Sequence, residues 1–414
     1  MKLVESNPGH AYKFLPNELL DRICLFSNNP ECLKLNFLSN NTIKSLVAHL
    51  DLKEELNLGN LHTVKPLIKL QGCVLQSNSM NNAASNGYLD ILIFLHENYT
   101  GGCTKDAMDY AAIYGHLDVV KFLHANRFEG CTKDAIDYAA GNGHLDIVTW
   151  LHENRSEGCT KTAMDEAARR GHLDVVKFLH KNRSEGCTTH AMNEAARYGY
   201  MDILKFLHIN RHEGCMEWAM DYAAINGRLD IIKWLHVNRR EGCTRAAMNE
   251  AAGNGYLDIV KFLHKYRSEG CTTRAMNEAA ANGHLEIVIF LHENRPEGCT
   301  KAAMDWAARN KHLDIVMFLH LNRTEGCNTI AMDHAARNGY LNIVIFLHEN
   351  RPEGCTTRAI DFAARYGHLK VVMFLHENRT EGYTTDAINW AIWEGNLEIV
   401  KWLHENRKKD LVIS

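Results

Sequence analysis

The stretch "EGCTKTAMDEAARRGHLDVVKFLHKNRS" at residues 157–184 decides the fold, because close copies of it begin at residues 129, 185, 241, 269, 297, 325 and 353. Glycine marks the same 28-residue period, from Gly59 to Gly395, in a chain of 414 residues, and one beat carries Lys311 instead. A fixed period of about 20–50 residues is typical of a solenoid or another repeat array. The chain is therefore expected to be one long array rather than several globular domains.

Each repeat is expected to contain two short helices. In residues 157–184, Thr160 is a suitable N-cap, and small or apolar residues at 163, 164, 167 and 168 form one stripe at helical spacing. Gly171 is expected to end this helix in the left-handed conformation. The segment 173–179 is apolar around most of a helical circumference, which predicts a second, buried helix. Asn182 is expected to end that helix, also in the left-handed conformation.

Such a unit is not expected to fold alone, because helices of about ten residues are marginal in water. Stacking repeats side by side supplies the missing core, and stability then accumulates through interfaces between neighbours. Ala167 and Ala168 are small, which is expected where helices approach closely.

The string "AMDEAARRGHLDVVKFLHKN" resembles the ankyrin repeat, and the match recurs eleven times between residues 101 and 408. Ala167-Ala168 stands for the alanine pair of that family and Gly171-His172 for its turn. The resemblance implies an all-α, elongated solenoid of about thirteen stacked helix-turn-helix repeats over residues 58–408, with short loops and a tail at 409–414. It also implies binding of a protein partner without catalysis.

The period of 28 residues is shorter than the ankyrin period of about 33. The missing residues fall between the second helix and the next threonine, where ankyrin repeats carry a protruding β-hairpin finger. We therefore expect a nearly all-helical version of the repeat. A tetratricopeptide array is the rival interpretation, but its period of about 34 and its W-x-x-L-G pattern are absent.

Composition excludes several classes of partner. The net charge is −4 and 46% of residues are apolar, so no general attraction to nucleic acid or to an acidic membrane surface is expected. No apolar run approaches the roughly 20 residues of a membrane helix, and the first residues lack the apolar core of a secretory signal. We expect a monomer in the cytoplasm, with the nucleus as the alternative compartment.

Cysteine and histidine recur with the repeat, which suggests a metal. Ten of the thirteen cysteines, from Cys103 to Cys355, lie 28 residues apart, and His152 precedes Cys159 by seven. A structural zinc needs four ligands, whereas one repeat offers two. We therefore expect reduced, packed thiols, and a histidine that favours the negative end of its helix. No metal and no cofactor is predicted. The histidines are His96, His124, His152, His180, His208, His236, His264, His292, His320, His348, His376 and His404.

One position of the first helix alternates between Asp and Asn, which excludes a catalytic carboxylate and predicts a hydrogen bond between neighbouring repeats. These residues are Asp109, Asp137, Asp165, Asn193, Asp221, Asn249, Asn277, Asp305, Asp333, Asp361 and Asn389. No phosphate-binding loop, H-E-x-x-H or G-x-S-x-G motif is present in the sequence.

Arginine recurs after the alanine pair, at Arg169, Arg197, Arg309, Arg337 and Arg365. These residues could form a basic strip for an acidic partner. However, Asp305–Arg309, Asp333–Arg337 and Asp361–Arg365 are spaced i, i+4, which favours ion pairs within each helix.

The most variable position of the first helix carries large aromatic residues near both ends of the array and glutamates between them. It lies away from the apolar stripe, so partial exposure is predicted. Aromatic residues and arginine are common anchors of protein interfaces. We hypothesise that this position, with its neighbours at 162 and 169 and their equivalents, lines a concave recognition surface; the alternative is that the aromatic rings cover the next repeat. The aromatic residues are Tyr110, Tyr138, Tyr222, Trp306, Phe362 and Trp390.

Residues 1–57 differ from the repeats and are expected to form a helical cap. "FLPNELLDRICLF" at 14–26 resembles the opening of an F-box, with matches at Leu15, Pro16, Glu18, Leu19, Leu20 and Ile23, and residues 30–41 could be its second helix. The resemblance implies an alternative function, substrate recognition for a cullin-type ubiquitin ligase whose adaptor binds Leu15, Pro16, Leu19, Leu20 and Ile23. The late tryptophan of the motif is absent. The other interpretation is an end cap for the solenoid.

Overall fold

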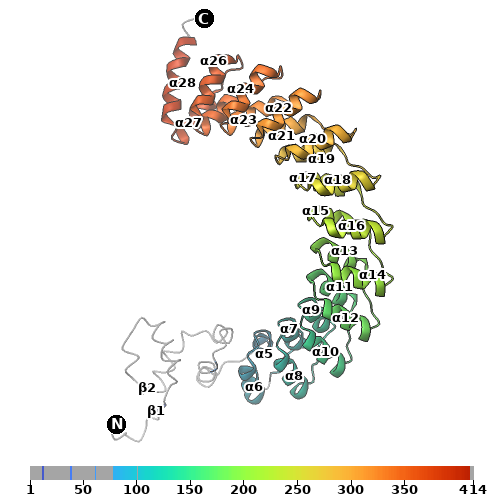
Figure 1. Cartoon of the computed structure of the whole chain (residues 1–414). Helices are drawn as coiled ribbons and strands as arrows, with labels where there is room; N and C mark the ends of the chain where they lie inside the picture. Colours follow the sequence, from blue (N-terminus) through green and yellow to red (C-terminus); the bar gives the residue numbers. More distant parts are fainter. Residues whose placement is uncertain (1–11, 14–37, 40–60, 62–77, 100, 411–414) are drawn as a thin grey trace, which may run out of the picture. The chain divides into compact units, whose positions relative to one another are not determined.

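The computed structural model describes residues 12–13, 38–39, 61, 78–99 and 101–410, and this part of the chain contains twelve consecutive helix pairs (Figure 1). The first helices of the pairs are α5 (Asn78–Ser85), α7 (Lys105–Ile113), α9 (Asp134–Gly141), α11 (Lys161–Arg170), α13 (Thr189–Tyr198), α15 (Trp218–Ile225), α17 (Arg245–Gly253), α19 (Thr273–Ala281), α21 (Lys301–Arg309), α23 (Thr329–Arg337), α25 (Arg358–Arg365) and α27 (Thr385–Trp393).

The second helices are α6 (Leu89–Asn98), α8 (Leu117–Asn126), α10 (Leu145–Asn154), α12 (Leu173–Asn182), α14 (Met201–Asn210), α16 (Leu229–Asn238), α18 (Leu257–Tyr266), α20 (Leu285–Asn294), α22 (Leu313–Asn322), α24 (Leu341–Asn350), α26 (Leu369–Asn378) and α28 (Leu397–Asp410). The predicted all-α repeat architecture is therefore confirmed. The last helix runs two residues into the segment expected to be a tail.

The expected start of each repeat is confirmed in the pair α11 and α12. The Thr160 hydroxyl accepts a hydrogen bond from the backbone N–H of Thr162 at 3.1 Å, which caps α11. Gly171 ends α11 with φ 88°, and the N–H of His172 bonds to the carbonyl of Ala167 at 2.9 Å.

The end of the second helix differs from the prediction. Asn182 is not left-handed: its side-chain amide donates to the carbonyl of Phe178 at 2.9 Å, and the following Arg183 takes an extended conformation with φ −126°. The asparagine thus binds a carbonyl of its own last turn, while the extended residue carries the chain directly to the next repeat.

The glycine that recurs every 28 residues lies in a turn that needs positive φ. Gly143 has φ +80°, and a Cβ there would lie 2.6 Å from the ring of His172 in the next repeat, so both conformation and space require glycine. Lys311, which replaces glycine at one beat, keeps the same conformation with φ 74° and is the one non-glycine residue with positive φ in the described part of the chain.

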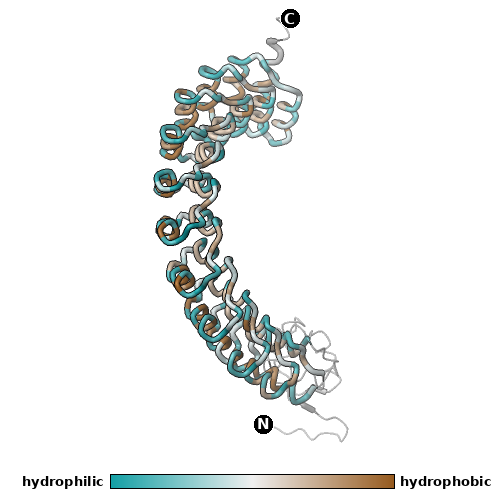
Figure 2. The backbone as a smooth tube through the Cα atoms, turned by 90° about the vertical axis from the view of Figure 1, so that its right-hand side faces the viewer, coloured by the Kyte–Doolittle hydropathy of each residue, from teal (hydrophilic) through white to brown (hydrophobic). Residues whose placement is uncertain are grey.

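The core consists of small residues in the first helix and branched residues in the second. Ala167, Ala168 and Val176 have no exposed surface, and Val175 and Leu179 are nearly as buried. Hydrophobic and hydrophilic segments alternate along every helix pair in Figure 2. Because the alanines are small, first helices of neighbouring repeats pack closely, as predicted.

The described residues divide into two compact parts, which are best considered one at a time. The first contains α5–α12, most of α13 and α14, and the second contains the end of α13 and α15–α28. Within each part, neighbouring first helices share a much larger contact than neighbouring second helices do. The row of first helices is therefore the inner, more closely packed row of each part (Figure 1).

The connections between repeats are short, as expected from the 28-residue period. Residues 155–160 are all that joins α10 to α11. Between residues 78 and 410, leaving residue 100 aside, the structure has no strand, so the β-hairpin finger is absent from this described stretch.

The front of the chain contains a feature that the sequence does not predict. Strand β1 (Tyr12–Lys13) pairs antiparallel with β2 (Leu38–Ser39). Residues 38–39 were expected to be helical, and that expectation is wrong because their backbone pairs with another strand. The adaptor-binding candidates Leu15, Pro16, Leu19, Leu20 and Ile23, and the first predicted repeat around Gly59, lie outside the described residues.

Candidate functional site

The Asp/Asn position bonds to the following repeat, as predicted, at Asp109, Asp137, Asp165, Asp221, Asn249, Asn277, Asp305, Asp333 and Asp361. Asp333 accepts hydrogen bonds from the backbone N–H of Thr356 at 2.8 Å and from its hydroxyl at 2.7 Å. Asn277 keeps the same geometry, accepting from the N–H of Thr300 and donating to its hydroxyl, both at 2.9 Å. Burial raises the pKa of Asp333, although the bonds from Thr356 oppose this shift. We call this set of contacts the ladder. Its carboxylates serve the structure, because they are already hydrogen-bonded to the next repeat.

A second contact between repeats surrounds each cysteine. Arg351 binds Glu353 at 2.7 Å, and Glu353 accepts the backbone N–H of Cys327 in the preceding repeat at 3.2 Å. Burial alone would raise the pKa of Glu353, but the hydrogen bond from Arg351 lowers it below its usual range. We call this contact the staple. The sequence shows its R-x-E-G-C pattern in most repeats, yet does not reveal that the pair reaches across the interface.

The cysteines are buried free thiols, as expected. Burial raises the pKa of Cys327 to about 11 and that of Cys355 to about 12, so both stay protonated at neutral pH. A reactive cysteine needs the opposite shift. The recurring cysteines therefore contribute to packing and do not act as nucleophiles.

The histidines from His96 to His376 lie in the last turn of their second helices, as predicted, and most of their rings pack between repeats, whereas His404 lies inside α28, which continues to Asp410. His264 meets Phe290 edge to face at 5.5 Å between ring centroids, and His348 meets Phe374 in the same way. Within the described residues, no group of three His, Cys, Asp or Glu side chains is arranged to hold a metal ion.

The variable position of the first helix is the centre of a stripe at i, i+4 and i+7, which in α25 consists of Arg358, Phe362 and Arg365. We call the equivalent residues of all repeats the recognition stripe. The predicted exposure of its centre is confirmed for Tyr110 (43%), Tyr138 (47%) and Trp306 (40%). Tyr222, Phe362 and Trp390 are half-buried. Glu194 is buried, with only 3% exposed.

The aromatic rings also touch neighbouring repeats, which is the contact that the alternative interpretation of this position predicts. Phe362 and Trp390 stack at 5.6 Å with an angle of 9° between their planes. The Arg197 guanidinium lies over the ring of Tyr222 at 5.1 Å. Trp306 has a freer face, which makes it the most accessible aromatic centre among the later repeats.

The ion pairs expected at i, i+4 do not form among the described residues at Asp305–Arg309, Asp333–Arg337 or Asp361–Arg365. The carboxylates point into the ladder instead, because hydrogen bonds across the interface satisfy them. Arg169 does form an ion pair within its helix, but with Glu166 at 2.6 Å.

Arg337 and Arg365 lie against aromatic rings of the following repeat. Arg337 sits 5.3 Å from the centre of Phe362 and 5.2 Å from that of Tyr366, whose hydroxyl accepts its hydrogen bond at 3.1 Å. Arg365 sits 5.5 Å from Trp390 and pairs with Glu394 at 3.3 Å. Cation–π contacts of this kind hold the guanidinium in place and leave donors for a ligand.

One exposed residue beside the stripe was missed from the sequence, and two tryptophans at positions equivalent to 162 and 169 were predicted to line the surface but were not singled out. Tyr366 stands where Asn338 and other repeats carry an asparagine that bonds to the preceding repeat. Trp218 and Trp393 lie on the stripe, and Trp393 is 83% exposed. The available signal was size, because most other repeats carry a smaller residue at each of these three positions.

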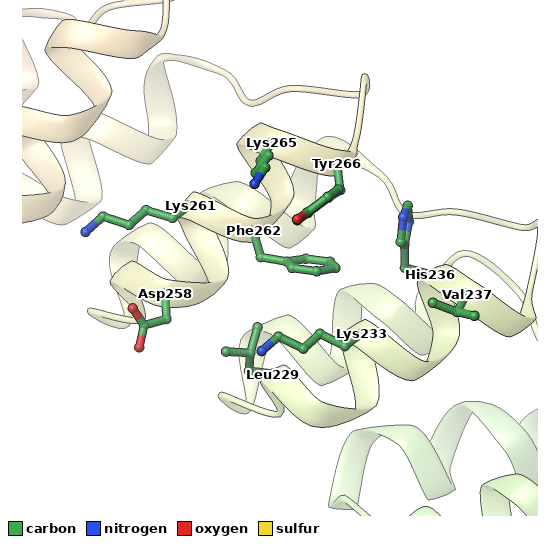
Figure 3. A pocket seen from close by; sticks show the side chains of 9 residues that line it. All are labelled: Leu229, Lys233, His236, Val237, Asp258, Lys261, Phe262, Lys265 and Tyr266. Carbon is green, nitrogen blue, oxygen red and sulfur yellow. The ribbon is translucent and has the colours of Figure 1, made fainter.

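A groove on the other row of helices is the main competing site. It lies between α16 and α18, and its lining includes three lysines and the rings of Phe262 and Tyr266 (Figure 3). Tyr266 replaces the usual terminal asparagine and packs on Phe262 at 4.7 Å and on His236 at 5.6 Å. The groove is shallow and open, and its rings already contact one another. The lysines are Lys233, Lys261 and Lys265.

In the described part of the chain, no helix combines the length and the apolar character needed to cross a bilayer.

Comparison with known proteins agrees with this geometry. A family model described as ankyrin repeats (3 copies) matches residues 108–193, 136–221, 220–305, 246–333 and 276–361, and a second, described as ankyrin repeats (many copies), matches residues 360–404. Together they cover more than half of the chain. A search of curated proteins finds no match. The chain therefore belongs to the ankyrin-repeat family, whose repeats are protein-interaction modules and are generally non-catalytic.

Proposed function

We propose that this chain is a non-catalytic scaffold that binds a protein partner along the recognition stripe of its first helices. The observation that carries the proposal is the contrast within each repeat. The ladder carboxylates and the alanine pair are buried, the staple is half-buried, and all three are nearly the same in most repeats, whereas the stripe changes from repeat to repeat and is partly exposed. A surface that varies on a constant frame is what a repeat array needs for specific recognition.

The residue types of the stripe support a protein partner. Trp306 exposes a large ring, and Arg309 and Arg337 lie on the same row of helices. Tryptophan, tyrosine and arginine dominate the binding energy of many protein interfaces, because they combine large contact area with hydrogen-bond donors. The inner row of first helices also presents these residues side by side within the second part of the molecule.

The test is partner capture by the full chain carrying Trp306→Ala and Phe362→Ala. The immobilised protein is exposed to a cell lysate, and retained proteins are quantified by mass spectrometry. We expect the specifically retained protein to fall by about tenfold, since each anchor residue typically contributes more than about 1 kcal/mol.

Tyr266→Asn is the matched control, because it removes an aromatic ring from the other row of helices and restores the residue that most repeats carry. It should leave capture unchanged. If the double variant retains its partner, the stripe is not the binding face. If its melting temperature falls as far as its capture, the two rings act in packing.

A second candidate function rests on the sequence of residues 14–26, which resembles the start of an F-box. In this function the array selects a substrate and the front segment recruits the adaptor of a cullin-type ubiquitin ligase. Co-purification of such an adaptor with the full chain, and its loss after deletion of residues 1–45, would support it. Equal recovery with and without these residues would exclude the segment as the adaptor site.

A further inference from the structure

The first helices α21, α23 and α25 expose basic side chains but no carboxylate. Their three acidic residues, Asp305, Asp333 and Asp361, are buried and belong to the ladder. The cations on these helices and the adjoining turn are Lys301, Arg309, Lys311, Arg337, Arg358 and Arg365. All are exposed except Arg365, which is half-buried. Arg309, Arg337, Arg358 and Arg365 lie on the stripe, and Lys301 and Lys311 lie beside it, so the exposed charged side chains of these three helices and the adjoining turn are all basic.

The preceding first helices lack this imbalance. On α17 and α19, Arg274 binds Glu250 at 2.8 Å and Glu278 at 2.6 Å, so the stripe neutralises itself there. On α21, α23 and α25 the corresponding centres are Trp306, His334 and Phe362. Replacement of glutamate by aromatic rings and histidine leaves the neighbouring cations without an internal counter-charge, apart from the contact of Arg365 with Glu394.

His334 reports the local field. It lies at the centre of α23, close to both Arg309 and Arg337. Burial lowers its pKa first, and the two guanidinium groups lower it further, although the buried Asp333 and Asp305 oppose them. His334 therefore lies close to two of the basic side chains of this surface.

We propose that the recognition stripe of α21, α23 and α25 binds an acidic segment of a partner protein that also carries an aromatic or large apolar side chain. This inference rests on the proposed function and assigns the chemistry of the partner. Carboxylates of the segment pair with Arg309, Arg337 and Arg358, whose forked donors suit them. Its apolar side chain packs on the exposed ring of Trp306. The complementary charges raise the association rate and select against basic partners.

The observations favour a protein segment over a nucleic acid. The basic surface covers only three first helices, and carboxylates flank it on both sides, at Glu278 on α19 and at Asp386 and Glu394 at α27. The net charge of the whole chain is −4. A nucleic acid backbone needs a longer basic track, because its charge is continuous.

The test uses the full chain and fluorescence anisotropy with three probes. The first is a short fluorescein-labelled peptide rich in glutamate with one central phenylalanine. The second is the same peptide with glutamine in place of glutamate, and the third is an oligo-deoxythymidine of equal length. We expect the glutamate peptide to bind more tightly than either other probe, by about tenfold, and its affinity to fall as NaCl rises from about 50 to about 300 mM.

The decisive variant carries Lys301→Glu and Arg309→Glu, both exposed and without a side-chain ion pair in the described structure. It should weaken binding of the glutamate peptide by about tenfold or more without changing the melting temperature. The matched control, Lys261→Glu with Lys265→Glu, makes the same charge change at the groove between α16 and α18 and should alter affinity less than about twofold.

Four results would overturn the proposal: equal binding of the glutamine peptide, tighter binding of the oligonucleotide, no effect of the Lys301/Arg309 variant, or loss of binding in the groove control. The proposed function can survive such a result. It would do so if Trp306→Ala with Phe362→Ala still abolished partner capture while the glutamate peptide failed to compete.

Discussion

The first helices α17 and α19 and the first helices α21, α23 and α25 share one frame and differ in their surfaces. Both groups use the ladder, with Asn277 in one and Asp333 in the other, and both carry the staple. On the surface, Arg274 of the first group is neutralised by two glutamates, whereas Arg337 of the second group lies against aromatic rings. Stability is thus encoded at positions that stay constant, and the proposed recognition at positions that vary within the same repeat.

The largest expected effect tests the shared frame. Asp333→Ala and Asn277→Ala should each destabilise the protein by about 2 kcal/mol, because each removes two hydrogen bonds and leaves the partner threonine unsatisfied. Urea denaturation followed by circular dichroism measures the change. Asp333→Asn is the control and should cost less than about 0.5 kcal/mol, since asparagine already fills the position at 277. A loss confined to one of the two groups would contradict a common frame.

A pH series tests the staple in both groups. Glu297→Gln and Glu353→Gln should each cost about 1–2 kcal/mol at neutral pH, because each removes the charge from a hydrogen-bonded ion pair. The folded pKa of both carboxyls is lowered below the ordinary 4.5. Their stabilisation is therefore present above about pH 4.5 and is lost as the pH falls through the folded pKa.

The difference in urea midpoint between the wild type and each staple variant should therefore become smaller as the pH falls from 5 to 3. The related Glu157 and Glu213 have pKa values of about 2, so their contribution begins to fall at about pH 4.5 and is fully lost only when the pH falls through about 2. Ladder carboxylates act in the opposite sense, because burial raises the pKa of Asp333 and its ionisation disfavours folding. A constant difference across this pH range would show that the staple glutamates do not gain from their charge.

Lys311→Gly makes the two groups identical at one turn position, because the turn after α19 already has Gly283 there. Lys311 is held at φ 74°, a conformation that costs an L-residue about 1 kcal/mol or more. Glycine removes this cost, and the greater flexibility of glycine in the unfolded chain offsets only part of the stabilisation. We expect stabilisation of about 0.5 kcal/mol in urea denaturation. Lys311→Ala serves as control and should not stabilise; equal effects of the two would remove the conformational explanation.

The smallest expected effect concerns the surface charges. Arg274→Ala should cost about 0.5 kcal/mol, because it breaks two exposed ion pairs. Arg309→Ala should be close to neutral, since no ion pair to it is found in the described structure. The cost of the first change should vanish in about 0.5 M NaCl. A larger loss at Arg309 than at Arg274 would mean that Arg309 acts in folding.

Most of the frame was predictable from the sequence, because its signals lie within one repeat and recur; the staple was not, because its arginine and glutamate act across the interface. The cap at Thr160, the left-handed turn at Gly171 and the alternation at Asp333 each recur every 28 residues, so their role could be inferred before the interface was known. The prediction of a left-handed residue at the end of α12 was wrong, because an asparagine can bind a carbonyl of its own turn as readily as it can adopt positive φ.

The surface was less predictable because its contacts depend on the register between repeats. Spacing within the helix suggested Asp333–Arg337, but Asp333 turns to Thr356 and Arg337 to Phe362 and Tyr366 in the next repeat. Sequence spacing within one helix cannot rank these competing partners. The exposed ring of Trp306 was identified correctly, since one variable position on a constant helix needs no such register.

The most direct test of the division between frame and surface is photo-crosslinking of the glutamate peptide, carrying a benzophenone, to the full chain, with the crosslinked residues located by mass spectrometry. The account predicts crosslinks on α21, α23 and α25, concentrated at the stripe around Trp306 and Arg337, and none on the self-neutralised stripe of α17 and α19. Crosslinks spread evenly over both groups, or gathered on the second helices α16 and α18, would contradict it.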